Sequence, residues 1–212
     1  MPPAGYLKRL RDICDTHGIL LVFDEVITGI GRTGKAFAAQ SFNVKPDIIT
    51  MAKALTNGAV PMGAVAVDQA IFDTVVGASK GAGPEFFHGY TYSGHPVACA
   101  AALASLDIYR DEDLFAKGEK LSPYFLECVS GLRGLPQVSD LRGYGLLSGI
   151  QLTPGETPGA KGNRVQRALY EAGLHVKTTG DAIIFAPALV AERQHVDAMI
   201  DILKTTLGQE NL

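Results

Sequence analysis

The spacing of hydrophobic residues changes abruptly within the first twenty-five positions. Over Tyr6–His17 the apolar residues recur at helical spacing, and Gly18 follows as a helix-ending residue. The next residues, Ile19–Phe23, are apolar without interruption, which predicts a strand buried on both faces, as in a parallel sheet. A helix followed directly by such a strand is the second half of a β-α-β unit.

Shorter signals predict the remaining elements. In the first part of the chain they are strands at Asp47–Met51 and Gly63–Val67 and helices at Pro96–Tyr109 and Asp113–Val129. A stretch rich in Gly, Leu and Arg at Gly131–Gly145 then precedes strand Leu146–Leu152, helix Asn163–Ala172, strands Leu174–Lys177 and Ala182–Ala186, and helix Glu192–Leu207. We therefore expect an α/β protein with part of a large domain over residues 1–130 and a smaller α/β domain over residues 131–212.

Composition removes several classes of protein from consideration. Hydrophobic residues make up 47% of the 212 and charged residues 19%, so the chain has ample material for a core. The net charge of −3 gives no reason to expect a nucleic-acid partner, and the apolar runs are too short to span a bilayer. Three widely spaced cysteines favour a reducing compartment, so we expect a cytoplasmic protein.

Candidate chemistry begins where the most hydrophobic strand ends, at Asp24. Open parallel sheets bind ligands beyond the carboxyl ends of their strands, and an acid there needs a cationic partner. A helix cap or a buried ion pair would be the ordinary interpretation of a single acid. Lys53, however, directly follows the next predicted strand among small apolar neighbours. Where water is scarce the charged form of lysine is disfavoured, and the neutral amine is a nucleophile for carbonyls.

The third feature is His88–Ala98, a turn rich in Gly and hydroxyl residues that opens the predicted helix at Pro96. Hydroxyls and backbone N–H groups at such a place suit a phosphate. An acid for a ring nitrogen, a lysine for an aldehyde and a hydroxyl turn for a phosphate together describe a site for pyridoxal 5′-phosphate (PLP).

These segments resemble a known family. Asp24–Gly34, the Lys53 segment with Asn57-Gly58, and His88–Ala98 are similar in kind and order to class III aminotransferases of fold type I, above all to ω-amino acid–pyruvate and β-alanine–pyruvate transaminases. The resemblance implies PLP-dependent transfer of an amino group from an amine or ω-amino acid to a keto acid such as pyruvate. It also implies a homodimer whose active sites are shared between subunits.

The resemblance also implies roles for individual residues. Lys53 matches the catalytic lysine that binds the cofactor aldehyde, and Asp24 the acid that keeps the pyridine nitrogen protonated. Val26 matches the aliphatic residue packed on one face of the ring. Thr91, with the backbone at Tyr90, matches a phosphate contact donated across the dimer interface.

Two departures from the family pattern affect what we expect. Lys177 stands where many members carry an arginine that binds the substrate carboxylate, and lysine offers a point charge without the bidentate fork. Lys177 is therefore a candidate substrate-binding residue, with a solvent-facing lysine as the alternative. The chain also resembles only the C-terminal half of the family's usual length, so we expect a fragment or a split gene with exposed strand edges and Met1 as an internal codon.

Alternatives to a working transaminase stay open at this point. The chain could be a non-catalytic remnant, one half of a split enzyme, or a class III racemase or aminomutase. Gly29–Lys35 also fits the spacing of a phosphate-binding P-loop, although position 36 is Ala where that motif needs Ser or Thr. His88 and His95 have no carboxylate or cysteine at ligand spacing, so we expect no metal site.

Overall fold

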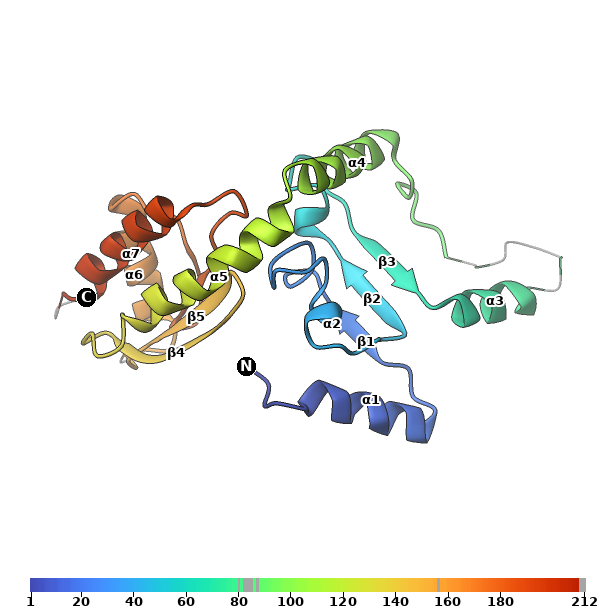
Figure 1. Cartoon of the computed structure of the whole chain (residues 1–212), viewed down its shortest axis with the longest axis horizontal. Coiled ribbons are helices and arrows are strands. Elements are labelled where there is room, and N and C mark those ends of the chain that lie inside the picture. Colours follow the sequence, from blue (N-terminus) through green and yellow to red (C-terminus); the bar gives the residue numbers. More distant parts are fainter. Residues whose placement is uncertain (80, 82–85, 87, 156, 210–212) are drawn as a thin grey trace. The chain divides into compact units, whose positions relative to one another are not determined.

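The structure, a computed structural model, describes residues 1–79, 81, 86, 88–155 and 157–209, and the chain forms two compact units (Figure 1). The N-terminal unit comprises residues 2–30 and 35–113. The C-terminal unit comprises residues 31–34 and 114–212, together with Met1. The domain division that we expected near residue 130 stays a prediction, and the units themselves divide between Asp113 and Leu114.

The N-terminal unit is built on a three-stranded sheet of order β1-β2-β3. β1 and β2 are parallel, and β2 and β3 are antiparallel. Its elements are α1 (Tyr6–His17), β1 (Val22–Asp24), α2 (Ala38–Ser41), β2 (Ile48–Met51), the 3₁₀ turn η1 (Lys53–Leu55), β3 (Ala64–Val67), α3 (Gln69–Ala78) and α4 (Pro96–Asp111). The predicted helix Tyr6–His17 is confirmed, including Gly18 as its left-handed C-cap.

A small cluster holds α1 to the start of the sheet. Cys14, Leu21 and Val44 are buried together. Beside them the Asp47 carboxylate accepts hydrogen bonds from the Arg11 guanidinium (2.7 Å) and from the backbone N–H of Leu21 (2.6 Å). These two donors hold the pKa of Asp47 below its ordinary value. One carboxylate thus ties the helix, the approach to β1 and the approach to β2 together.

The prediction that Ile19–Phe23 is buried on both faces is wrong for this chain. The strand begins only at Val22, and the side chains of Ile19, Leu20 and Val22 are each more than half exposed. The apolar run is real, but within the described residues no second layer covers it. These positions have the composition of a buried strand, but the described residues of this chain do not bury them.

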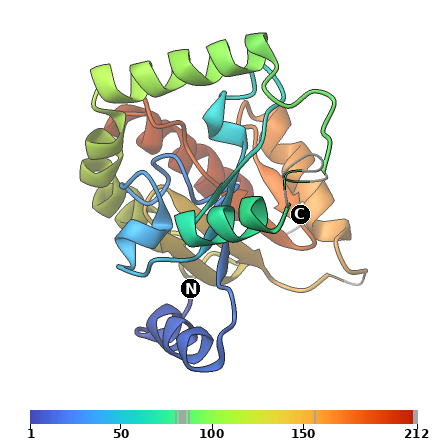
Figure 2. The same cartoon turned by 90° about the vertical axis from the view of Figure 1, so that its right-hand side faces the viewer.

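The C-terminal unit packs helices on one face of an antiparallel sheet of order β4-β5-β7-β6. Figures 1 and 2 show its helices gathered beside the strands. Its elements are α5 (Leu114–Ser130), β4 (Val138–Tyr144), β5 (Leu147–Leu152), α6 (Ala160–Glu171), β6 (Lys177–Thr179), β7 (Ala182–Phe185) and α7 (Arg193–Leu207).

Alternate residues of β5 and β7 are fully buried, as expected when helices cover one face of a sheet. α5 and α6 both pack against α7, and α6 also packs against β6 and β7. At the centre the rings of Phe125 and Phe185 lie 5.2 Å apart between centroids. This unit therefore has a hydrophobic core of its own.

Three expectations need correction. The stretch Gly131–Gly145 contains strand β4, which its polar residues and an irregular register near Val138 conceal. The strand expected at Leu174–Lys177 begins only at Lys177. Helices α2 and α3 were not predicted, because α2 has four residues and α3 buries none of its side chains.

Asp181 closes the N-terminus of α6. Its carboxylate accepts hydrogen bonds from the backbone N–H groups of Gly162 (2.8 Å) and Gly159 (3.1 Å). The close approach requires glycine at position 162, since a Cβ there would lie 2.0 Å from the carbonyl oxygen of Gly180. The same two N–H groups hold the pKa of Asp181 below its ordinary value.

We predict that Asp181→Asn destabilises the C-terminal unit at neutral pH and reduces its sensitivity to acid. A carboxyl whose pKa is lower in the folded than in the unfolded chain stabilises fully above the unfolded value of about 4, and that stabilisation is lost as pH falls through the folded value. Thermal unfolding measured from pH 7 to about pH 2.5 tests this. The exposed Asp201→Asn on α7 is the matched control, and equal pH profiles for the two variants would refute the prediction.

Glu25, next to Asp24, is buried with only 2% of its surface exposed. Its carboxylate accepts hydrogen bonds from the backbone N–H groups of Ala38 and Ala39 (2.7 Å each) and from the hydroxyl of Thr28 (2.9 Å). Ala38 and Ala39 are the first residues of α2, whose N–H groups have no partner within the helix. A buried carboxylate is thus satisfied entirely by hydrogen-bond donors.

We predict that Glu25→Gln lowers the free energy of unfolding by about 1–3 kcal/mol, because an amide NH₂ then faces N–H groups that need an acceptor. The matched control is Asp24→Asn on the same strand, whose side chain is exposed and should change stability by less than about 0.5 kcal/mol. Urea unfolding followed by circular dichroism makes the comparison. Equal losses in both variants would show that the buried hydrogen bonds of Glu25 do not matter.

Candidate active site

Asp24 and Lys53 leave the sheet at the same end. Asp24 is the last residue of β1 and lies opposite Thr50 in the parallel pairing, and Lys53 begins η1 directly after β2. The Oδ1 atom of Asp24 accepts hydrogen bonds from the backbone N–H of Val26 (3.0 Å) and from the Thr50 hydroxyl (3.4 Å). Among the described residues both bonds go to Oδ1, and Oδ2 has no hydrogen-bond donor there.

Lys53 is held in an unusual backbone conformation. Its φ of 47° lies in the left-handed region, which is uncommon for a residue with a side chain and often marks functional sites. The turn is fixed from α4, where the buried Tyr109 donates its hydroxyl hydrogen bond to the carbonyl oxygen of Ala54 (2.7 Å). The Lys53 side chain itself is exposed, so the prediction of a dry surrounding is wrong within this chain.

The loop after Lys53 explains the residues Asn57-Gly58. Both have positive φ, 51° and 76°, a conformation that asparagine and glycine tolerate best. Buried Thr56 donates its hydroxyl to the carbonyl oxygen of Val60 (2.6 Å) and closes the loop. The lysine is therefore presented by a turn that is tied at both ends.

The turn that carries Tyr90 and Thr91 is exposed. Ser93 donates its N–H to the Tyr90 carbonyl (3.0 Å), and His95 donates to the Tyr92 carbonyl (3.2 Å) before α4 begins at Pro96. Within the described residues the hydrogen bonds of this turn stay inside it. The N-terminal unit thus brings Asp24, Val26 and Lys53 to one end of a strand pair, and no hydrogen bond in the described part of the chain joins Thr91 to them.

Lys177 is the first residue of β6 in the C-terminal unit. Its side chain is exposed, whereas the neighbouring Thr178 donates a hydrogen bond to the side chain of Gln166 (2.8 Å). Gln166 in turn donates to the carbonyl oxygen of Val176 (3.0 Å). The backbone on both sides of Lys177 is therefore fixed to α6, while its ammonium stays available.

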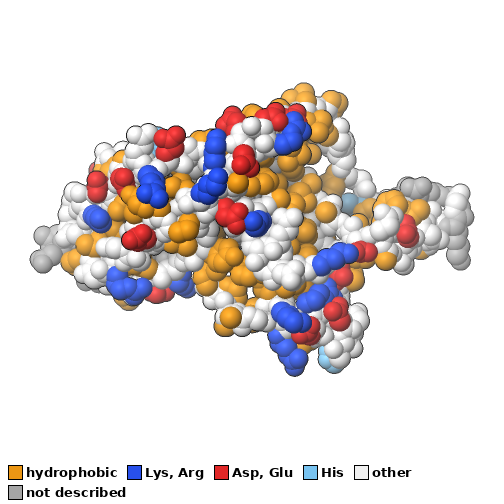
Figure 3. All heavy atoms as spheres, viewed as in Figure 1, with side chains coloured by type: hydrophobic (Ala, Val, Ile, Leu, Met, Phe, Trp, Pro, Cys, Tyr) orange, Lys and Arg blue, Asp and Glu red, His pale blue; other side chains and the backbone are white. Residues whose placement is uncertain are grey.

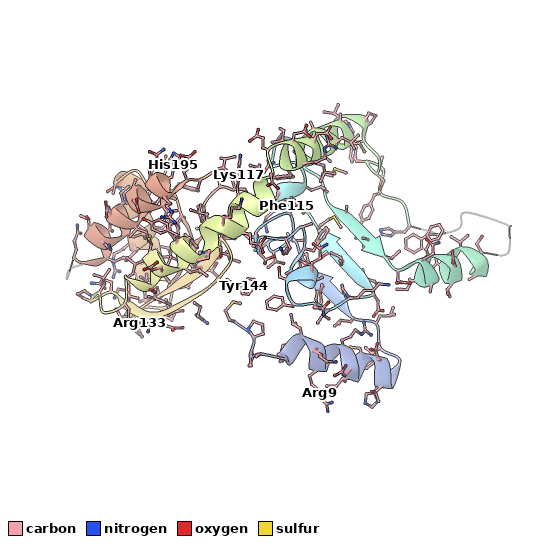
Figure 4. The ribbon with its side chains drawn as sticks, in the orientation of Figure 1. Arg9, Phe115, Lys117, Arg133, Tyr144 and His195 are labelled. Carbon is pink, nitrogen blue, oxygen red and sulfur yellow. The ribbon has the colours of Figure 1, made fainter. Side chains whose placement is uncertain are left out.

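Arg32 anchors a loop. Residues 31–34 belong to the C-terminal unit, and there the Arg32 guanidinium donates to the carbonyl oxygens of Leu146 (3.1 Å) and Pro187. Leu146 returns a hydrogen bond from its N–H to the Arg32 carbonyl (2.9 Å). Gly31 lies so close to Phe115 of α5, labelled in Figure 4, that a Cβ would come within 2.6 Å of the ring.

These contacts weigh against a P-loop at Gly29–Lys35. A P-loop offers free backbone N–H groups at the start of a helix to phosphate. Here the following helix, α2, has four residues, and its first two N–H groups are already bonded to the Glu25 carboxylate. A second negative charge would meet an anion there.

The residues present fit PLP. Asp24 is exposed and its Oδ2 has no donor among the described residues, which suits the N–H of a pyridine ring, and the exposed amine of Lys53 suits an aldehyde. Sequence reasoning missed Glu25, Thr50 and Tyr109, which support this arrangement. Thr50 could have been found from the sequence, because it is the third residue of β2 and lies opposite Asp24, the third residue of β1. In the described part of the chain no group of three His, Cys, Asp or Glu side chains could hold a metal ion.

Among the described residues, none of the helices is both long enough and apolar enough to cross a bilayer.

Comparison with known proteins shows which family the chain resembles. The omega-aminotransferase of Caulobacter vibrioides is 49% identical over 210 residues, which are 99% of this chain and 48% of that protein. The omega-amino acid–pyruvate aminotransferase of Pseudomonas putida is 43% identical over 216 residues, 99% of this chain and 47% of that protein.

A crystal structure of an (S)-enantioselective omega-transaminase from Thermomicrobium roseum superposes with a TM-score of 0.90 and 38% identity, covering 98% of this chain and 47% of that one. The chain therefore spans about half the length of these relatives. Residues 1–207 match the family described as Aminotransferase class-III. With its acid and its lysine at the same end of one strand pair, the chain belongs to the class III aminotransferases.

Proposed function

We propose that the chain forms part of a PLP-dependent transaminase that moves an amino group from an amine or ω-amino acid, such as β-alanine, to a keto acid, such as pyruvate. The observation that carries this proposal is the placement of Asp24 and Lys53 at the same end of the parallel pair β1–β2 in a class III chain. The names of the Pseudomonas putida relative and of a beta-alanine–pyruvate aminotransferase from Pseudomonas aeruginosa, 44% identical, support the choice of substrates.

In this proposal each residue has one task. Asp24 accepts the N–H of the cofactor ring and keeps that proton in place, while Thr50 and the Val26 N–H hold the carboxylate in orientation. When bound, PLP supplies an electron sink for the negative charge that develops on the substrate carbon. Lys53 would bind the cofactor aldehyde covalently until the substrate amine displaces it. The freed Lys53 amine would then take a proton from the substrate carbon as base and return it as acid.

The remaining residues bind and orient. Val26, half-buried at the turn after β1, packs on one face of the ring. Thr91 and the backbone of Tyr90 bind the cofactor phosphate of a second subunit in a homodimer, and the exposure of their turn supports this assignment. Lys177 binds the substrate carboxylate as a point charge. The free cysteines support a reducing, cytoplasmic compartment.

The half-length match keeps a second candidate in view. A match to about half of the relatives' length also fits a remnant without activity of its own, or a racemase or aminomutase that uses the same acid and lysine. Product analysis separates these outcomes, since only transamination converts the keto acid into an amino acid.

We predict that PLP added to the 212-residue chain, followed by borohydride reduction, labels Lys53 stoichiometrically. Peptide mass mapping reads out the site. Lys53→Ala should remove the label, and in an active complex it should lower turnover by about 10²–10⁴-fold or more, because the same amine binds and transfers the proton. Lys45→Ala is the control, since the ammonium of Lys45 is exposed and paired with Asp68 at 2.6 Å. Label spread over surface lysines would count against the proposed site.

We predict that Lys177→Arg strengthens the use of substrates that carry a carboxylate. A bidentate guanidinium adds about one charge-assisted hydrogen bond, so KM for β-alanine should fall roughly five- to tenfold, with little change for a primary amine that lacks a carboxylate. Lys177→Met should raise the same KM. Steady-state kinetics with the two donors makes the test, and parallel changes for both donors would show that Lys177 does not read the carboxylate.

A further inference from the structure

Helix α4 has an exposed side and a buried side of different composition. Its exposed large hydrophobic side chains are Val97, Leu103, Leu106 and Ile108, and Figure 3 shows hydrophobic side chains at the surface over this helix. Its buried residues are Ala98, Ala102, Ser105 and Tyr109, which recur every three or four positions and therefore lie along one stripe. The other members of this stripe are small, so Tyr109 is the buried residue that extends furthest from the helix axis.

The Tyr109 side chain reaches the turn that carries Lys53. Tyr109 is only 5% exposed, and its hydroxyl donates a hydrogen bond to the carbonyl oxygen of Ala54 (2.7 Å), the residue directly after Lys53. Helix α4 and the turn η1 also pack against each other. A buried tyrosine hydroxyl needs a hydrogen-bond partner, and here the backbone beside the lysine provides it. The contact therefore joins the last turn of α4 to the backbone at Ala54, 55 positions earlier in the sequence.

Lys53 needs such support because its backbone conformation is unfavourable for a lysine. Its φ of 47° lies in the left-handed region, which is disfavoured about five- to thirtyfold for residues that have a Cβ. Before Lys53 the chain is fixed by β2, whose last residue, Met51, pairs with Ala64 of β3. After Lys53 the carbonyl of Ala54 is the backbone group that Tyr109 holds. The left-handed residue therefore lies between two fixed points.

The hydrogen bond from Tyr109 is strong enough to decide this conformation. A hydrogen bond between neutral groups changes an equilibrium by about two- to tenfold, and loss of one partner leaves the other group unsatisfied. This effect is of the same order as the penalty for the left-handed conformation of Lys53. Without the Tyr109 hydroxyl, much of the compensation for that penalty would be lost.

We propose that Tyr109 is a positioning residue for Lys53. Through its hydrogen bond to Ala54 it keeps the Lys53 backbone left-handed, and this conformation presents the amine to the cofactor aldehyde at the end of the sheet where Asp24 also lies. The inference rests on the proposed function, because the orientation of the amine matters only if Lys53 binds the aldehyde. The ring of Tyr109 fills space in the unit, whereas its hydroxyl has the positioning task.

The first test removes the hydroxyl and keeps the ring, by Tyr109→Phe in the 212-residue chain without cofactor. NMR reports the φ angle of Lys53 through the scalar coupling and the NOE between its amide proton and its Hα. We expect the ratio of left-handed to right-handed conformation at Lys53 to fall about two- to tenfold. A tyrosine that only fills space would leave this ratio unchanged.

The second readout is the reactivity of the Lys53 amine toward PLP. After borohydride reduction, peptide mass mapping gives the initial rate of labelling at Lys53 relative to Lys45, an exposed lysine that serves as internal reference in the same sample. In Tyr109→Phe this relative rate should fall at least about twofold, because fewer chains present Lys53 in the left-handed conformation.

Tyr124→Phe is the matched control. The Tyr124 hydroxyl donates to the Asp197 carboxylate in the C-terminal unit, so this variant loses a hydrogen-bonded hydroxyl of the same kind in the other unit. Both readouts should stay within about twofold of those of the unchanged chain. Far-UV circular dichroism checks folding. If Tyr109→Phe does not fold, the addition of Lys53→Gly should restore folding, because glycine adopts a positive φ without the penalty.

The inference would be overturned by an unchanged ratio of conformations in Tyr109→Phe, by an equal change in Tyr124→Phe, by labelling of Lys53 that does not follow its conformation, or by failure of Lys53→Gly to restore an unfolded Tyr109→Phe chain. Failure of the proposed function looks different. If Lys53 of the unchanged chain takes no label while its conformation still depends on Tyr109, the cofactor assignment is wrong and the positioning by Tyr109 stands.

Discussion

The parallel pairing of β1 with β2 is the constraint on which the site depends. The carboxyl ends of parallel strands lie at the same edge of the sheet, so the residues that follow two neighbouring strands lie close together. Asp24 and Lys53 are 29 positions apart in sequence, yet the register Asp24–Thr50 puts the end of one strand beside the end of the other. Three residues of β1 and four of β2 are enough to fix this relation.

Two adjacent carboxylates at the end of β1 have opposite surroundings. Glu25 is buried and bonded to the N–H groups that begin α2, whereas Asp24 is exposed and one of its oxygens has no donor among the described residues. Since successive residues of an extended segment face opposite sides, one acid supports the loop and the other remains for chemistry. Glu25 therefore fixes the backbone directly beside the acid that we propose for the cofactor ring.

Much of this could be predicted from the sequence, for reasons that can be named. The amphipathic spacing of α1 and α7 is a local property, so both helices were found within a residue of their ends. Burial is not local: Ile19–Phe23 has the composition of a covered strand, but the covering layer is not among the described residues. The roles proposed for Asp24 and Lys53 rest on motifs, whereas the hydrogen bond from Tyr109, 55 residues beyond Ala54, is visible only in the structure.

The loop anchored by Arg32 has a consequence for how such proteins recombine. Residues 31–34 are part of the C-terminal unit, although they lie in sequence between β1 and α2 of the other. A graft that exchanged only residues 114–212 between relatives would separate the Arg32 guanidinium from the carbonyl oxygens of Leu146 and Pro187 to which it donates. An exchange that keeps these contacts from one protein therefore has to include both residues 31–34 and residues 114–212.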